Sequence, residues 1–345
     1  MKRRVIVVTF VFSALLVSAG HSFFRALTSG ESLTASASKY LSTLDKKQLA
    51  KSTMAYDSEK RVDWHFIPKD HRKGLQIKEM NETQRKAALA LLKNCLSEVG
   101  NDKAIKIMEL EKVLAEYEKD RKGGNIRDPE RYYYTVFGEP KADGKWGLSI
   151  EGHHLSLNFV IEKNEVISST PQFLAANPGV MMSAAAGVKK GQRVLADEEL
   201  VAFELVNSLS DEQKKQAIIA KKAPREIRAA GAAQPPADEK VGIRVGDLTD
   251  EQKQTIRKLV STYIRTAPED VARQRVEEIL NSNIDDIRFA WAGPTKPGVG
   301  HYYRVQGEAF LVEFVNTQPD AAGNPANHIH AVFRSMSSDF ALPAK

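Results

Sequence analysis

One helix-start pattern occurs four times in this chain and constrains the fold more than any other feature. In each copy an apolar residue precedes a residue whose side chain can cap a helix N-terminus, and a glutamine stands three positions after the cap. The copies are residues 44–48 (LDKKQ), 80–84 (MNETQ), 209–213 (LSDEQ) and 248–252 (LTDEQ). One such capping box is common by chance. Four of them, each followed by helical periodicity, predict helix starts at matching places in two halves of the chain.

The segments around the boxes repeat as well. Residues 74–77 (GLQI) lead into the second box, and residues 242–245 (GIRV) lead into the fourth at the same distance. Beyond the helices, an ungapped alignment places Gly138 on Gly293 and Gly152 on Gly307. We interpret residues 37–165 and 199–334, approximately, as a tandem duplication. The alternative is that two unrelated segments converged on the same helix and hairpin chemistry.

The sequence pattern of each half predicts helices followed by an antiparallel meander. The expected helices are residues 82–99, 102–121, 250–266 and 268–281. The expected strands are residues 132–137, 147–151, 154–161, 287–291, 302–306, 309–315 and 328–334. The predicted fold class is therefore α+β, with two tandem-duplicated helix-plus-antiparallel-meander units packed as a pseudo-two-fold pair.

The same features divide the chain into segments. We expect a signal peptide over residues 1–19, a flexible N-terminus of the mature chain over 20–36 and the first repeat unit over 37–167. A junction over 168–198 then leads to the second unit, residues 199–345. Within that unit, residues 220–240 are rich in alanine and proline, which predicts a loop.

The first residues predict export. Lys2, Arg3 and Arg4 precede an uncharged apolar run over residues 5–19, which ends in the small residues of a cleavage site. The alternative is an uncleaved membrane anchor, but a run of this length falls short of the roughly 20 residues that span a bilayer. The sequence therefore predicts a periplasmic or extracellular protein that has no membrane contact once its signal peptide is removed.

Charge and cysteine content exclude several classes of function. The formal net charge is +6, and removal of the three basic residues of the signal peptide leaves about half of it, spread along the chain. Nucleic-acid binding usually needs a concentrated basic face, so no nucleic-acid partner is expected. Cys95 is the only cysteine, which excludes an internal disulfide and a cysteine-based metal cage. It falls on an apolar helical stripe, which predicts a buried thiol.

A His-x-His pair lies on the last predicted strand. Alternation puts His328 and His330 on one face of this strand and the apolar residues on the other. Two imidazoles so placed can reach one metal ion. Glu313 is a lone carboxylate on the preceding strand and is expected on the same face. Two histidines and a carboxylate with open coordination positions would suit Zn²⁺ or non-haem Fe²⁺.

A second histidine cluster, His153 and His154, follows Gly152 at a predicted hairpin turn. Our hypothesis is one asymmetric site between the halves, with His154, Glu313, His328 and His330 as metal ligands. The catalytic candidates are His153, His154 and Arg334, and Arg334 could bind an anionic substrate group.

Plainer alternatives remain for each group. For the histidines the alternative is a set of satisfied side chains on a polar sheet face, and for Arg334 it is a structural ion pair with Asp339.

Several motifs resemble one bacterial family. They are residues 64–68 (WHFIP), 152–158 (GHHLSLN), the hairpin over 302–314 and residues 327–334 (NHIHAVFR) followed by Asp339 and Phe340. Together they resemble the exported family catalogued as domain of unknown function 3500, over about residues 41–340. The resemblance implies an exported protein whose domain occupies the whole mature chain. It implies no activity, substrate or cofactor.

The sequence thus favours an exported metal-dependent hydrolase with a divalent ion (Zn, Fe or Cu) and an unknown small-molecule substrate. The alternative is a non-catalytic protein that binds a metal or a small ligand, or an interaction protein of the cell envelope. The oligomeric state does not follow from the sequence.

Overall fold

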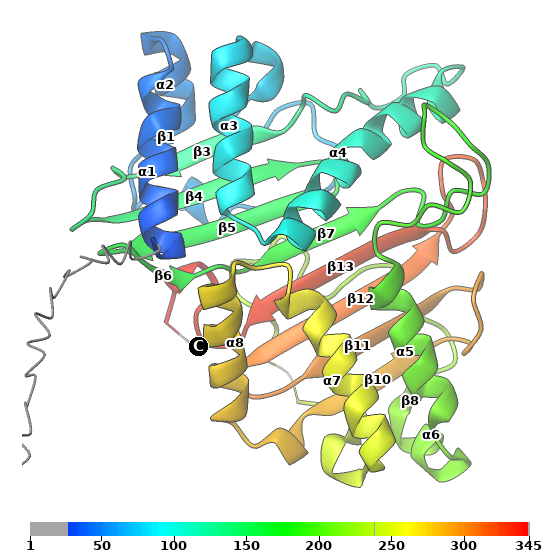
Figure 1. The fold of residues 1–345 in the computed structure, drawn as a ribbon. Helices are drawn as coiled ribbons and strands as arrows, with labels where there is room; N and C mark the ends of the chain where they lie inside the picture. The colour runs from blue at the N-terminus through cyan, green and yellow to red at the C-terminus, as the bar shows by residue number, and fades with distance from the viewer. Residues whose placement is uncertain (1–26, 238, 344–345) are drawn as a thin grey trace, which may run out of the picture.

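The computed structural model describes residues 27–237 and 239–343, which form a mixed α and β fold around one large sheet (Figure 1). The α+β class is thereby confirmed. The strands on the main path of this sheet are β1 (Thr53–Met54), β3 (Tyr133–Phe137), β4 (Lys145–Gly152), β5 (Leu155–Glu162), β7 (Gln172–Ala176), β13 (His328–Ser335), β12 (Phe310–Gln318), β11 (His301–Gln306), β10 (Arg288–Ala292) and β8 (Ile218–Ala220), in this spatial order. Short strands β2 (Leu75–Gln76), β6 (Glu165–Ser168) and β9 (Ile243–Arg244) pair beside β3, β5 and β10.

The strand order is symmetric about the pair β7 and β13. Each half contributes a three-strand antiparallel meander, β3–β4–β5 or β10–β11–β12. Each meander also has a short parallel neighbour at its outer edge, β1 beside β3 and β8 beside β10. The two central strands pair antiparallel and join the halves into one continuous sheet.

The helices lie on one face of this sheet (Figure 1). They are α1 (Ser29–Ser42), α2 (Lys46–Ser52), α3 (Glu82–Asn94), α4 (Glu98–Glu118), α5 (Ala196–Ser208), α6 (Asp211–Ala217), α7 (Asp250–Ile264) and α8 (Glu269–Leu280). Against them, each strand presents its apolar alternate residues, so the main hydrophobic core lies between the helices and the sheet.

All four capping boxes predicted from the sequence are formed, at the starts of α2, α3, α6 and α7. Their glutamines also pair across neighbouring helices. The Gln48 amide donates to Gln84 Oε1 over 3.1 Å, and the Gln213 amide donates to Gln252 Oε1 over 2.9 Å. The repeated glutamine therefore both caps its own helix and binds the next box.

The opposite face of the sheet is covered by irregular chain. Residues 55–74 and residues 221–237 of the loop after β8 cross this face, and they meet where the Trp64 indole donates to the Ala232 carbonyl over 2.8 Å. A smaller apolar cluster lies beneath them and includes Trp64, Phe66 and Phe173. This irregular cover, rather than the helix layer, surrounds the histidines described below.

Several segment boundaries differ from the sequence expectations. Residues 29–36, expected to be flexible, begin α1, because Thr28 and Glu31 form a further capping box. The expected junction over 168–198 contains β7, which is buried at the centre of the sheet. The first long helix ends at Asn94 rather than near residue 99, because Ser97 caps the next helix.

The expected signal peptide lies outside the described residues. No helix in the described part of the chain is both long and apolar enough to cross a membrane. Cys95 is buried, as its place on the apolar stripe of α3 predicts, and burial raises the pKa of its thiol.

Candidate metal centre

Strand β13 carries His328 and His330 on the face opposite the helices. Its alternate residues Ile329 and Ala331 lie in the main core between sheet and helices, as the sequence pattern predicts. The imidazoles therefore project into the irregular cover on the other face. His330 is 4% exposed and packs edge-on against the ring of Phe66.

His154 reaches the same place from the first half of the chain. It lies in the turn between β4 and β5, with a backbone φ of 66° that suits a tight turn. Its backbone N–H donates to the Phe66 carbonyl, and its carbonyl accepts from Ala175 N–H at 3.0 Å. Ala175 is on β7 and lies opposite His330 in the sheet register. Only β7 therefore separates the turn from β13, a span of about 10 Å for two strand spacings.

The three imidazoles converge through their Nε2 atoms. The Nε2 atom of His328 is 2.8 Å from Nε2 of His154 and 3.1 Å from Nε2 of His330. One ligand atom from each of the three residues lies within 4.8 Å of the others. Metal–nitrogen bonds of 2.0–2.1 Å place neighbouring ligand atoms about 2.9–3.4 Å apart for right-angled to tetrahedral geometry. The spacing is thus that of nitrogens around one ion.

Hydrogen bonds on the far side of the rings favour this arrangement. Both carboxylate oxygens of Glu226 contact His330 Nδ1, at 2.8 and 2.9 Å, so this nitrogen carries the proton and Nε2 keeps its lone pair. The His328 ring hydrogen-bonds the backbone of Pro319, which can only accept. The Nδ1 atom of His328 also lies 3.4 Å from the Asn177 side-chain amide, so the ring is held from its outer side.

The surroundings also keep the rings of His154 and His328 uncharged. Burial, reinforced by the neighbouring imidazoles, lowers the pKa of His154 well below its ordinary value. Burial, together with the adjacent His330, lowers the pKa of His328 to about 2. Neutral imidazole is the form that binds a metal ion. Two neutral imidazoles with their Nε2 atoms this close together suit a shared cation.

His153 lies directly behind this group. Its ring stacks on His154 with 3.7 Å between ring centroids. Its Nδ1 contacts a carboxylate oxygen of Glu111 and lies 3.1 Å from the Arg127 guanidinium. Burial lowers the pKa of His153, while the Glu111 carboxylate opposes that effect. The ring is therefore held in place by its neighbours on α4 and the following loop.

A cavity of about 300 Å³ opens in front of the imidazoles. Its apolar wall is formed by residues 66–68 of the segment that crosses the sheet. The polar lining comes from Arg225, Glu226 and Gln318, and from the histidines His153, His154, His328 and His330. The volume is at the lower end of the range for small-molecule sites, and the cavity gives a ligand access to the three Nε2 atoms.

Glu313 is not among the three converging ligand groups. It shares the expected sheet face, but it lies opposite Val332 in the register, whereas Val315 lies opposite His330. Its Oε1 atom accepts from the Tyr302 hydroxyl at 2.6 Å and from Arg228 Nε at 2.9 Å. This carboxylate is therefore held in a separate buried cluster, one step farther along the strand.

Arg334 forms the structural ion pair that was the alternative from sequence. The side chain is buried, and its Nε donates to Asp339 Oδ2 over 2.6 Å. Its Nη2 donates to the Ala232 carbonyl over 2.7 Å. Arg334 does not line the histidine cavity. It binds the backbone of the loop that carries Glu226, and through this loop it helps to position the Glu226 carboxylate.

Sequence reasoning missed three groups at this centre: Glu226, Glu111 and Arg127. Glu226 stands in an alanine- and proline-rich loop that has no periodicity, so no local signal marks it. Glu111 and Arg127 belong to a stretch of alternating charges that resembles a solvated helix surface. Glu111 and Arg127 are recognised as part of the centre only by their contacts with His153. Glu226 is recognised only by its contact with His330.

Comparisons with known proteins give one match. Neither the search of curated proteins nor the search of solved structures returned a match. The family model whose description reads "protein of unknown function (DUF3500)" matches residues 28–342, which include the described sheet, its helices and all three imidazoles. The chain belongs to the DUF3500 family.

Proposed function

We propose that this protein is a metal-dependent hydrolase that holds one divalent ion on His154, His328 and His330. The observation that carries the proposal is the convergence of three imidazoles at one end of an open cavity, where His328 Nε2 lies 2.8 Å from His154 Nε2 and 3.1 Å from His330 Nε2. Glu226 accepts the proton of His330 on its outer nitrogen, so the His330 Nε2 lone pair faces the other two imidazoles and is available to a metal ion.

The donor set favours Zn²⁺ as the resident ion. Three histidines with a further open position are a known arrangement for catalytic zinc. Non-haem iron oxygenases use two histidines and one carboxylate on the metal, and here Glu226 binds the outer nitrogen of His330 rather than joining the ligand group. Copper shares the preference for imidazole, so metal analysis has to distinguish copper from zinc.

The reaction would be attack of an activated water on a substrate in the cavity. A bound Zn²⁺ lowers the pKa of a coordinated water to about 7 and polarises a carbonyl or phosphoryl oxygen. His153 lines the same cavity and would accept the proton from that water, with Glu111 holding the ring. Glu226 would orient His330 and strengthen it as a ligand.

The cavity indicates the class of substrate. Its volume of about 300 Å³ suits a small organic molecule. Residues 66–68 offer an apolar surface, and Arg225 offers a cation at the exposed rim. We therefore infer an ester, amide or phosphoester with an apolar part and an anionic group within reach of Arg225.

Two further parts of the proposal concern location and origin. The basic and apolar residues at the start of the sequence support export to the periplasm or the medium. The symmetric strand order and the two matching pairs of capping glutamines support a tandem duplication. Under that proposal, the metal centre arose where the two copies meet.

Metal analysis of the purified mature protein tests the centre. We expect about one equivalent of zinc per chain, lost on dialysis against a chelator and restored by added Zn²⁺. His328→Ala and His154→Ala should abolish stoichiometric binding, whereas His71→Ala, at an exposed histidine, should retain it. A wild-type protein that is purified metal-free and fails to bind added Zn²⁺, Fe²⁺ or Cu²⁺ would refute the proposal.

Activity is tested separately with small chromogenic esters and phosphoesters. Turnover that requires the metal and falls strongly in His153→Gln supports the hydrolase. Stoichiometric metal with no turnover across the panel, and unchanged affinity for substrate analogues in His153→Gln, would favour the non-catalytic metal-binding protein.

A further inference from the structure

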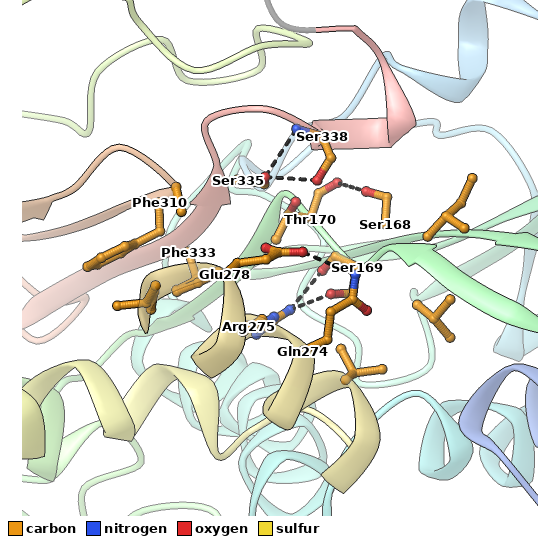
Figure 2. A pocket seen from close by; sticks show the side chains of 15 residues that line it. Ser168, Ser169, Thr170, Gln274, Arg275, Glu278, Phe310, Phe333, Ser335 and Ser338 are labelled. Atoms are coloured by element: carbon orange, nitrogen blue, oxygen red, sulfur yellow. Dashed lines mark hydrogen bonds between the residues drawn. The ribbon is translucent and has the colours of Figure 1, made fainter. Parts of the chain in front are cut away.

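A second cavity lies on the helix side of the sheet, between α8 and the ends of β12 and β13 (Figure 2). Its lining includes Arg275 from α8, Ser168 at the end of β6, Ser169 just after it, and Ser335 and Ser338 near the C-terminus. The metal centre is at the opposite end of β13, because His328 begins this strand and Ser335 ends it. The two cavities share no lining residue.

Arg275 is a buried cation with unmet donors. The side chain is 5% exposed, and its guanidinium lies over the ring of Phe333 at 4.6 Å. Nη2 donates to the Ser169 carbonyl and hydroxyl, over 3.1 and 2.8 Å. Within residues 27–237 and 239–343, Nε and Nη1 have no hydrogen-bond partner. A buried charged group with unpaired N–H donors is strongly unfavourable unless something else binds them.

Arg334, a buried arginine on β13, shows how a guanidinium with all its nitrogens hydrogen-bonded is arranged in this fold. Arg334 donates from Nε to Asp339, from Nη1 to Ala229 and from Nη2 to Ala232. Arg275 has no comparable acceptors on its Nε and Nη1 side, although it is almost as deeply buried. Burial lowers the pKa of Arg275 to about 10, so the side chain is still a cation at neutral pH.

Hydroxyl groups in the same cavity can add donors. Ser335 Oγ already accepts from the backbone N–H of Ser338 at 3.1 Å and from the Ser338 hydroxyl at 2.8 Å. Its own proton can go to the Ser337 hydroxyl, 3.4 Å away, or to an acceptor bound in the cavity. Glu278 lines the exposed rim of the cavity. Its negative charge would repel a bound anion and so lower the affinity of the site for anions.

The size of the cavity selects among anions. Its volume of about 20 Å³ accommodates one or two atoms of water size. A carboxylate fits with its two oxygens inside and the rest of its molecule outside, and the planar guanidinium matches it geometrically. A phosphate or sulfate, with five heavy atoms, is too large to enter completely.

We propose that Arg275 and the surrounding serine hydroxyls form a binding site for the carboxylate group of a small molecule or of a chain end, separate from the metal centre. The bound carboxylate would connect α8 of the second half to the segment after β6 of the first half. Ligand binding at this place therefore stabilises the packing of the two halves.

Thermal unfolding and calorimetric titration of the mature full-length chain test the site, with sodium formate as the probe. Sodium chloride and sodium phosphate are the comparison anions, at constant ionic strength. We expect formate to raise Tm saturably, by about 1–4 °C at tenfold excess over Kd. Phosphate should have little effect. A saturable response to chloride alone would identify a halide site and overturn the carboxylate proposal.

Matched substitutions locate the effect. Arg275→Gln should remove the formate response, whereas Arg273→Gln, at an exposed arginine two positions away on α8, should retain it. If Arg275→Gln does not fold, two milder variants decide: Ser335→Ala should weaken formate binding, and Glu278→Gln should tighten it about twofold or more. No saturable response in the wild type, an unchanged response in Arg275→Gln, or unchanged affinities in both milder variants would refute the site.

Discussion

The Nε2 atom of His328 lies 2.8 Å from the Nε2 atom of His154, although 174 residues separate the two in the sequence. The contact crosses β7, which lies between the turn that holds His154 and the strand that holds His328. The two halves of the sheet therefore complete one site that neither half could form from its own residues.

Substitution of a ligand should have opposite effects with and without metal. In metal-free protein we expect His328→Ala to change the free energy of unfolding by less than about 1 kcal/mol, or to increase it, because it removes one of three closely crowded imidazoles. With Zn²⁺ at about 100 times the wild-type Kd, the wild type should gain about 2.7 kcal/mol and the variant should gain none. Urea unfolding in both conditions measures this. A large loss of stability in the metal-free variant would instead indicate that the histidines satisfy one another as structural hydrogen-bonding groups.

Loss of the carboxylate behind His330 should weaken the metal without removing it. Glu226→Gln keeps the shape of the side chain but lacks the charge that orients the ring and strengthens its Nε2 as a ligand. We expect metal affinity to fall by about 10- to 100-fold, measured by competition with a chelating dye. Glu212→Gln, at an exposed carboxylate on α6, is the control and should leave affinity unchanged. Equal affinities in both variants would show that Glu226 has no role at the centre.

Removal of the Arg334 side chain should affect both stability and the site. Arg334→Ala leaves Asp339 buried without its partner and frees the loop that carries Glu226. Breaking a buried pair of this kind costs about 3–5 kcal/mol of unfolding free energy. Urea unfolding measures this loss, and metal titration of the folded variant should show weaker binding. Arg273→Ala, which breaks an exposed pair, should cost less than about 1 kcal/mol.

The depressed pKa values predict acid sensitivity of the metal-free protein. In the folded state His154 and His328 stay neutral well below pH 6.5, whereas in the unfolded state they take up protons below that value. The unfolded state then binds more protons, so the free energy of unfolding decreases as the pH falls. Each group contributes up to about 1.4 kcal/mol per pH unit below pH 6.5.

Urea unfolding of metal-free protein at pH 7.5, 6.5 and 5.5 measures this dependence. The double variant His154→Ala/His328→Ala should show a shallower decrease with falling pH, whereas His71→Ala should follow the wild type. A wild type and double variant with the same pH dependence would contradict the assignment of neutral buried rings.

The backbone at the hairpin turn offers one further test. A side chain at Gly152 would meet the ring of Tyr132, because a Cβ there would lie only 2.4 Å from a ring carbon. Gly152→Ala should therefore displace the turn that carries His153 and His154. We expect weaker metal binding and a loss of about 1–3 kcal/mol of unfolding free energy, as for other overpacked positions. Gly144→Ala, where neighbouring atoms are at ordinary contact distances, is the matched control.

Some local features of the fold could be predicted from the sequence, and others could not. The capping boxes depend on residues three positions apart, and alternation along β13 depends on residues two apart, so both could be predicted without knowing the fold. β7 was missed because residues 172–176 form a short apolar run without alternation, and its two partner strands are distant in sequence. The face on which Glu313 lies was predicted correctly, but its separation from His330 depends on the strand register.

Short-range sequence patterns were enough to predict the class of fold, the starts of the helices and the residues that could supply imidazole ligands. Those properties come from backbone hydrogen bonding and side-chain periodicity over a few residues. The tertiary structure alone decided that β7 brings the His154 turn to β13, that Glu226 rather than Glu313 serves the histidines, and that Arg334 binds Asp339. Contacts between distant segments depend on strand order and on the paths of irregular loops, which no short-range pattern encodes.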